Sequence, residues 1–172
     1  MKTLIILLLV LALPVLAQDS NNIKILKKIN ELRMSKGLNT LKYDSSLHKI
    51  ASKWSTYIIH ELNVHSTDSI LSKQKNNEMF MHINYKRRFK ELLKRSDINM
   101  VGENLHIIMD RDFDEDFVEH SFDSWKKSPH HYDLMIEKEN INVAFSYVYD
   151  KIKKRLLCIL VMTENIENKK GG

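Results

Sequence analysis

The sequence predicts an α+β fold in which several amphipathic helices precede a C-terminal pair of strands. Apolar residues recur at helical intervals along much of the chain before residue 136. By contrast, residues 141–149 and 155–163 are rich in β-branched, aromatic and leucine side chains, which is typical of strands. The polar segment 150–154 can turn between these two segments, so we expect them to form a hairpin.

Two helices are expected before this hairpin, near the N-terminus. The first places Ile25 and Ile29 on one face, and Gly37 can end it by adopting a left-handed conformation. Asp44 or Ser45 can cap the second helix at its start. The buried stripe of that helix repeats at helical spacing and comprises Leu47, Ile50, Ala51, Trp54 and Ile58.

Three further helices are expected between these and the strands. One spans 85–96, and its basic stretch 86–90 is expected to form a solvated face. The next begins in the acidic run 112–116, because negative charge favours a helix N-terminus. Ser128-Pro129 ends that helix and can start a short one through Met135. Aromatic residues of the longer helix are expected in the core rather than around a ligand: Phe113, Phe117 and Trp125.

The N-terminus has the form of a secretion signal. Lys2 precedes an apolar run from Leu4 to Leu13, and Val15-Leu16-Ala17 is a small-residue cleavage site. The apolar run is too short for a stable transmembrane helix, and no cysteine follows the cleavage site to carry a lipid. We therefore expect the protein to be secreted or held at the outer surface.

One folded domain is expected in the mature chain. The expected division is a signal peptide at 1–17, a single domain at 18–163 and a flexible tail at 164–172. The one cysteine, Cys158, lies in an apolar run, so we expect it to be buried, and no intrachain disulfide can form. The net charge of +5 becomes +4 without Lys2, which is only a mild excess of basic residues. We therefore do not expect nucleic acid as the partner of this exported protein.

His65, Glu103 and His131 are the candidate ligands for a divalent metal ion such as zinc or magnesium. They supply two imidazoles and one carboxylate from three distant segments, and these ligand types suit zinc. A nearby pattern resembles the zinc-protease signature, but its histidines, His60 and His65, are five positions apart rather than four. On a helix that spacing turns them about 140° apart, so a metalloprotease of that type is excluded.

Several motifs occur in an order that resembles one known family. In chain order they are Ile29-Asn30-x-x-Arg33, Gly37-Leu38-x-x-Leu41-x-Tyr43-Asp44, His65-Ser66, Gly102-Glu103-Asn104-Leu105 and Trp125-x-x-Ser128-Pro129-x-His131. The chain resembles the CAP superfamily of cysteine-rich secretory, antigen 5 and pathogenesis-related 1 proteins, or SCP domains, in its cysteine-poor bacterial form. The resemblance implies a three-layer α-β-α sandwich with a small antiparallel sheet. It also implies a central cleft lined by two histidines and two glutamates, in which members can bind divalent metal; some members bind sterols or other lipids.

The resemblance assigns two of the four cleft residues. His65 matches the first histidine, and Glu103 matches the first glutamate, which lies in the same glycine-glutamate-asparagine motif. The position of the second glutamate is Ser128 here, and the glycine-histidine-tyrosine motif of the second histidine does not occur, so the tetrad is incomplete. His131 is expected to point into the cleft, and Asn104 and Ser128 are expected either to line it or to fix backbone turns.

Two classes of function follow from these observations. The first is an exported non-enzymatic binding protein that engages an extracellular host or envelope partner, with methionines near the loops offering an apolar surface to a sterol or other lipid. The alternative is a metal-dependent hydrolase, in which His65 and His131 hold the metal and Glu103 acts as ligand or base. No serine or cysteine nucleophile with an ordered base partner is evident, so no catalytic residue is assigned. We expect binding rather than catalysis.

Overall fold

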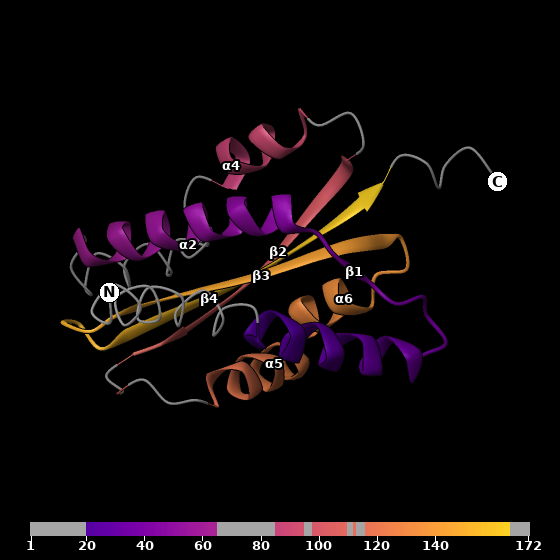
Figure 1. The fold of residues 1–172 in the computed structure, drawn as a ribbon, viewed down its shortest axis with the longest axis horizontal. Coiled ribbons are helices and arrows are strands. Elements are labelled where there is room, and N and C mark those ends of the chain that lie inside the picture. The colour runs from indigo at the N-terminus through magenta and orange to yellow at the C-terminus, as the bar shows by residue number, and fades with distance from the viewer. Residues whose placement is uncertain (1–19, 65–84, 95–97, 110–111, 113–115, 166–172) are drawn as a thin grey trace, which may run out of the picture.

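A computed structural model describes residues 20–64, 85–94, 98–109, 112 and 116–165. Residues 20–34 form an N-terminal helix, drawn in indigo in Figure 1. The labelled elements then follow in the order β1 (Lys42–Tyr43), α2 (Ser45–Val64), α4 (Tyr85–Leu92), β2 (Ile98–Ile108), α5 (Phe117–Lys127), α6 (Pro129–Ile136), β3 (Asn140–Asp150) and β4 (Arg155–Asn165).

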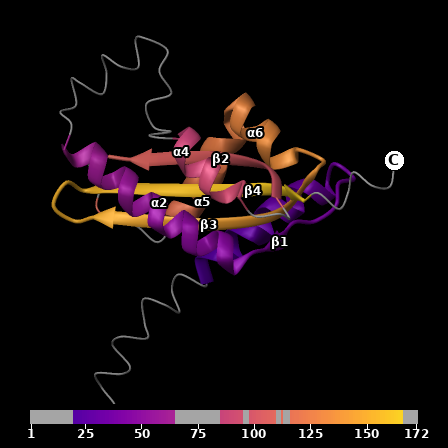
Figure 2. The ribbon, with the colours of Figure 1, turned by 90° about the horizontal axis from the view of Figure 1, so that it is seen from above.

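The described strands form one sheet with the order β1-β3-β4-β2. β4 pairs antiparallel with both β3 and β2, so that Leu160 lies between Phe145 and Asn104. The two-residue β1 pairs parallel with β3 at the other edge. Figure 2 shows β4 between its two long neighbours, with α2 crossing over them. The strand β4 thus lies between β2 and β3 in the sheet, although it follows both of them in the sequence.

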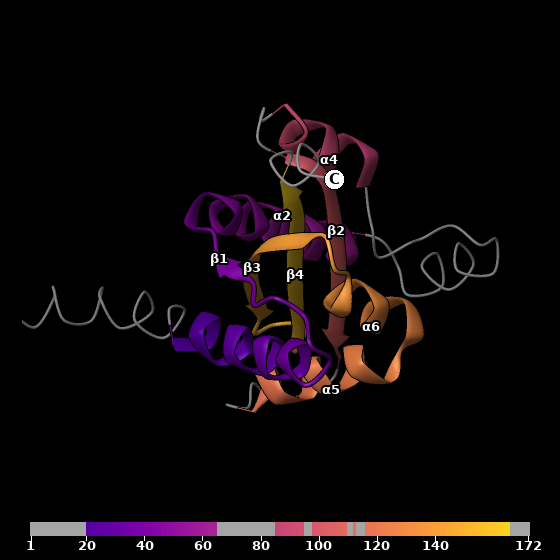
Figure 3. The ribbon, with the colours of Figure 1, turned by 90° about the vertical axis from the view of Figure 1, so that its right-hand side faces the viewer.

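Helices cover both faces of this sheet. The helices α2 and α4 lie over one face, while the N-terminal helix, α5 and α6 lie on the other side (Figures 1 and 3). Each helical layer packs its own hydrophobic cluster against the strands. The structure therefore confirms the predicted α+β class and the three-layer α-β-α arrangement.

Side-chain alternation along β4 explains how one strand serves both clusters. Leu157, Ile159 and Val161 contribute to the cluster under α2 and α4. The residues between and beside them belong to the opposite cluster and comprise Leu156, Cys158, Leu160 and Met162. Each of these side chains is buried, as a central strand covered on both faces requires. Cys158 is fully buried, as predicted, and burial raises the pKa of its thiol to about 12.

Local sequence signals set the helix ends as expected. The Asp44 carboxylate accepts hydrogen bonds from the backbone N–H groups of Ser46 (2.8 Å) and Leu47 (3.0 Å), which caps α2. Gly37 adopts a left-handed conformation with φ of 70°, where a side chain is unfavourable, and follows the N-terminal helix. The short helix α6 begins at Pro129 and the predicted hairpin is present as β3 and β4.

The structure also departs from the predicted elements. β2 was not expected as a strand, α4 ends at Leu92 rather than at 96, and α5 begins at Phe117 rather than within 112–116. The described β4 continues through Asn165, two residues beyond the expected end of the second strand at 163. Phe113 lies outside the described residues, while Phe117 and Trp125 are buried in the core as predicted.

Candidate functional site

Glu103 is held by an ion pair inside the protein. It lies in the middle of β2, and its carboxylate faces α4, where it meets the guanidinium of Arg88. Each carboxylate oxygen accepts one hydrogen bond: Oε1 from Nη2 at 2.7 Å, and Oε2 from Nη1. The Arg88 side chain is 5% exposed and that of Glu103 is fully buried. This bidentate geometry is the strongest form of an arginine–carboxylate pair.

Aromatic rings of the α2 and α4 layer surround the same guanidinium. The Arg88 Cζ lies 4.8 Å from the ring centroid of Trp54 and 5.8 Å from that of Phe89. These two rings pack edge to face with centroids 5.4 Å apart. Arg88 is therefore part of the core, although its position in the basic stretch 86–90 predicted a solvated face. A guanidinium that stacks on rings and pairs with a carboxylate satisfies its charge without water.

Asn104 and His131 meet on the other side of β2. Because successive side chains of a strand point to opposite faces, Asn104 faces away from Glu103. Its Nδ2 donates a hydrogen bond of 2.9 Å to the backbone carbonyl of His131 in α6. Asn104 is buried, and this bond ties β2 to the backbone of α6. Glu103 and Asn104 are thus neighbours in sequence, but their side chains face different helical layers.

Of the remaining expected cleft residues, the structure describes Ser128 and does not describe His65. Ser128 is the N-terminal cap residue of α6 and its side chain makes no capping hydrogen bond, while its carbonyl accepts one from Tyr132. His65 lies outside the described residues. Within the part of the chain that the structure describes, no group of three histidine, cysteine, aspartate or glutamate side chains could hold a metal ion. The metal set of His65, Glu103 and His131 stays a prediction.

Gly102 explains how α6 approaches β2 so closely. A Cβ atom built at this position would lie 2.2 Å from Cδ1 of Leu134 in α6. Glycine in the glycine-glutamate-asparagine motif therefore makes room for the helix that Asn104 holds. The motif thus serves both faces of β2, with Gly102 and Asn104 toward α6 and Glu103 toward α4.

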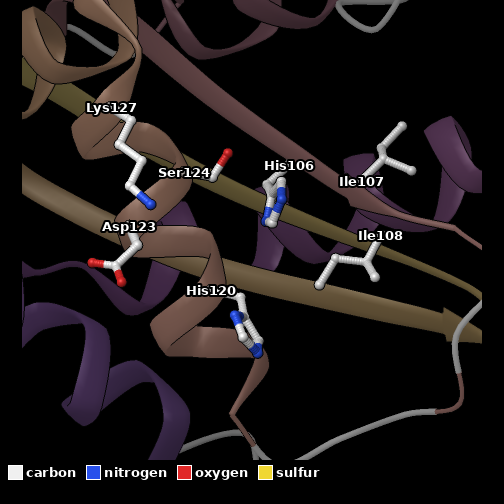
Figure 4. Close-up of a pocket in the computed structure, with 7 residues that line it drawn as sticks. All are labelled: His106, Ile107, Ile108, His120, Asp123, Ser124 and Lys127. Carbon is white, nitrogen blue, oxygen red and sulfur yellow. The ribbon is translucent and has the colours of Figure 1, made fainter.

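A pocket that the sequence did not predict lies between β2 and α5. It has a volume of about 450 Å³ and is lined by His106, Ile107, Ile108, His120, Asp123, Ser124 and Lys127 (Figure 4). Three of the α5 residues, His120, Ser124 and Lys127, follow one another at intervals of four and three, which places them on one side of the helix. Figure 4 shows the Ser124 hydroxyl turned toward His106, whereas the Asp123 carboxylate points away from it.

The buried hydroxyl of Ser121 orients the His106 ring. Its Nδ1 lies 3.0 Å from Oγ of Ser121, a fully buried residue of α5. Burial lowers the pKa of His106, and the nearby charges of His120 and His131 lower it further. At neutral pH this imidazole is therefore neutral and fixed in direction. Sequence reasoning gave His106 and His120 no role, because only a β2 strand facing α5 brings them together.

Comparison with known proteins identifies the family. The family model of the cysteine-rich secretory protein (CAP) family matches residues 26–161, which is most of the chain. The chain therefore belongs to the CAP family. A search of the curated proteins finds no match.

Solved structures with the same fold include bacterial proteins. An outer surface protein from Borrelia burgdorferi is 17% identical with a TM-score of 0.56, and the match covers 81% of this chain and 88% of that one. A cysteine-rich secretory protein from Staphylococcus aureus is 17% identical with a TM-score of 0.55, covering 86% and 39%. An extracellular SCP-domain protein from Bacillus anthracis has the same identity and TM-score, covering 86% and 41%.

These likenesses support the fold and no more. The chain spans less than half of the length of the Staphylococcus and Bacillus proteins, so it corresponds to one part of each. Within the described residues, no helix is both long and apolar enough to cross a membrane.

Proposed function

We propose that this chain is an exported, non-enzymatic CAP-domain protein that acts by binding an extracellular or envelope partner through its outer surface. The proposal does not use the family's cleft as a metal or catalytic centre. The secretion signal predicted at residues 1–17 supports export, as do the outer-surface and extracellular descriptions of the similar bacterial structures.

The state of Glu103 is the observation that carries the proposal. Both carboxylate oxygens accept hydrogen bonds from Arg88, and the side chain is fully buried. A metal ligand needs an oxygen lone pair directed at the ion, and a general base needs access to the water that it activates. The burial of this carboxylate and its pairing with Arg88 favour a structural role for Glu103 over either of these. The positive guanidinium, 4.8 Å from the Trp54 ring centroid, would also repel a cation placed beside the carboxylate.

The hydrolase alternative requires Glu103 and His131 to act on one metal ion. Glu103 faces α4, whereas His131 belongs to α6, whose backbone is bonded to the opposite side of β2. These contacts place the two residues on elements that pack against different faces of β2, which favours surface binding over a shared ion.

A zinc titration by calorimetry tests the proposal. The protein is recovered from the medium of an expressing strain, and its mass is compared with that expected for a chain starting at Gln18. We expect no zinc binding that depends on Glu103, and therefore identical titrations for the wild type and Glu103→Gln at a temperature at which circular dichroism shows both to be folded. Hydrolysis of ester and peptide substrates in the presence of zinc should likewise be the same for both.

His65→Ala serves as the matched variant for the other predicted ligand. Tight zinc binding that is lost in both His65→Ala and Glu103→Gln, with unchanged circular dichroism, would overturn the proposal in favour of the metal-dependent hydrolase. Retention of the protein inside the cell with residues 1–17 uncleaved would contradict the export part separately.

A further inference from the structure

We propose that the pocket between β2 and α5 is a binding site for a phosphate group. It is lined by His106 from β2 and by His120, Ser124 and Lys127 from α5. This site goes beyond the surface binding proposed above and shares no residue with the Arg88–Glu103 pair, so the two proposals fail independently.

The donor set matches an oxyanion. Two imidazoles, a hydroxyl and an ammonium group line the pocket, and all four can donate hydrogen bonds. A phosphate group has three or four oxygens and takes donors from several directions, whereas a carboxylate offers two oxygens in one plane. Lys127 supplies a full positive charge at neutral pH. Among the described residues of the lining Asp123 is the acidic one, and it turns its carboxylate away from His106 (Figure 4).

The contact between Ser121 and His106 at the wall of the pocket supports a binding role. Ser121 has no exposed surface, yet its hydroxyl lies 3.0 Å from Nδ1 of His106. This contact occupies one ring nitrogen and leaves Nε2 as the nitrogen that can contact a ligand in the pocket. A buried side chain that orients an imidazole at the wall of a pocket is the arrangement used to aim histidines at ligands.

The size and the walls of the pocket indicate what carries the phosphate. Its volume of about 450 Å³ lies within the range of small-molecule sites and exceeds the volume of a phosphate ion alone. The Ile108 side chain adds an apolar portion to the lining, whereas the Ile107 side chain packs on the opposite face of β2. A phosphate ester with a small organic part therefore fits better than free phosphate, although the recognition chemistry is the same for both.

Two opposing effects set the pH dependence of binding. The described titratable groups that face the pocket or act on it are His106 of β2, His120, Asp123 and Lys127 of α5, and His131 of α6. Because the folded protein lowers the pKa of His106, this imidazole is neutral at neutral pH and gains its charge only in more acidic solution, and a bound anion favours the charged form. The phosphate group itself loses a charge below its second pKa of about 6, which works against this gain.

The test is an NMR titration of the full chain with three probes: inorganic phosphate, glycerol phosphate and acetate. The resonances of the His106 and His120 rings are followed at about pH 6 and about pH 8, on either side of the ordinary histidine pKa. We expect saturable shifts with both phosphate probes at each pH, and weaker binding of acetate. Tighter binding of glycerol phosphate than of inorganic phosphate would identify an ester ligand, and equal binding would identify free phosphate.

Neighbouring lysines give a matched pair of variants. Lys127→Gln removes a charge from the pocket lining and should weaken phosphate binding about tenfold, the effect of one charge-assisted hydrogen bond. Lys126→Gln removes the same charge one residue away, outside the lining, and should leave the affinity unchanged. Ser121→Ala tests the positioning role, since it should change the tautomer signature of the His106 ring nitrogens and weaken binding.

Two results would overturn the proposal. One is the absence of a saturable shift of the histidine resonances with either phosphate probe at about pH 6. The other is an equal loss for Lys126→Gln and Lys127→Gln, or equal affinity for acetate, because either would show attraction of anions by the net charge alone. Lys127 is exposed, so its variant is expected to fold normally, and circular dichroism checks this.

Discussion

Arg88 and Glu103 place two full charges where water does not reach. Removing a carboxylate and a guanidinium from water costs several kcal/mol for each ion, and their mutual attraction with good hydrogen bonding offsets much of that cost. The bidentate contact and the rings of Trp54 and Phe89 provide this geometry. The stability of each partner therefore depends on the presence of the other.

We predict that the two single substitutions are far more harmful than the double one. Arg88→Met or Glu103→Met leaves one buried charge without its partner and should lower the free energy of unfolding by about 3–5 kcal/mol. The double variant replaces the pair with apolar side chains and should recover most of that loss. Urea unfolding of the four proteins measures the effect, with Lys90→Met, an exposed position on α4, as the control. Additive losses in the double variant would show that the ions act separately.

At the scale of the element, the β3–β4 hairpin is held at its turn by Asp150. Its Oδ1 accepts hydrogen bonds from the backbone N–H groups of Ile152 (2.8 Å) and Lys153 (3.0 Å), and Asn63 of α2 donates to Oδ2. The pKa of Asp150 lies below its ordinary value, first because of the hydrogen bond from Lys153, and then because of those from Ile152 and Asn63. The turn is thus tied to the end of α2.

This lowered pKa predicts how the hairpin responds to acid. Because the folded-state pKa lies below the unfolded one, the contribution is present above the unfolded pKa of about 4 and is lost as the pH falls through the folded value. Asp150→Asn should therefore lower the melting temperature at neutral pH, and the difference from the wild type should shrink toward about pH 3. Thermal scans across this range measure it.

A second exposed aspartate serves as the control for the acid response. Asp133→Asn on α6 should keep the wild-type melting temperature at each pH. A difference between Asp150→Asn and the wild type that stays constant with pH would contradict the assigned cause.

The sequence predicts some elements much better than others, for physical reasons. The hairpin and α2 carry long apolar patterns with capping or turn residues at their ends, so local signals agree with the fold. β2 has Glu103, Asn104 and His106 near its centre, and these polar side chains interrupt the apolar pattern by which a strand is recognised in a sequence. Their partners, Arg88, the His131 carbonyl and Ser121, come from other elements. For the same reason the pocket at His106 could not be predicted before the strand was known.

At the scale of the whole molecule, one buried arginine joins three parts of the chain. Arg33 lies near the end of the N-terminal helix and is fully buried. Its guanidinium donates hydrogen bonds to backbone carbonyls of the following loop, the end of α6 and the start of β3: Asn39 (2.7 Å), Met135 (3.0 Å), Glu137 (2.8 Å) and Asn140 (3.4 Å). The Asn30-x-x-Arg33 motif is thus structural, since Asn30 likewise bonds both backbone groups of Leu41.

We predict that even a conservative change at this junction destabilises the entire domain. Arg33→Lys keeps the charge but lacks the planar fork that reaches several carbonyls, so it should lower the free energy of unfolding by about 3 kcal/mol. Urea unfolding followed by tryptophan fluorescence and by circular dichroism measures it, and both signals should shift together. Lys36→Met, an exposed change in the same turn, should have little effect. A shift in one signal alone would place the effect in one layer.

The order of the strands also governs when the sheet can form. β4 lies between β2 and β3 and supplies pairing for both, yet its residues follow theirs along the chain. While a ribosome adds residues from the N-terminus onward, β2 and β3 have no common partner until residues 155–165 emerge. The domain therefore closes late, after most of the chain has been made. Both helical layers therefore acquire their shared strand at the same point of synthesis, because β4 contributes side chains to both hydrophobic clusters.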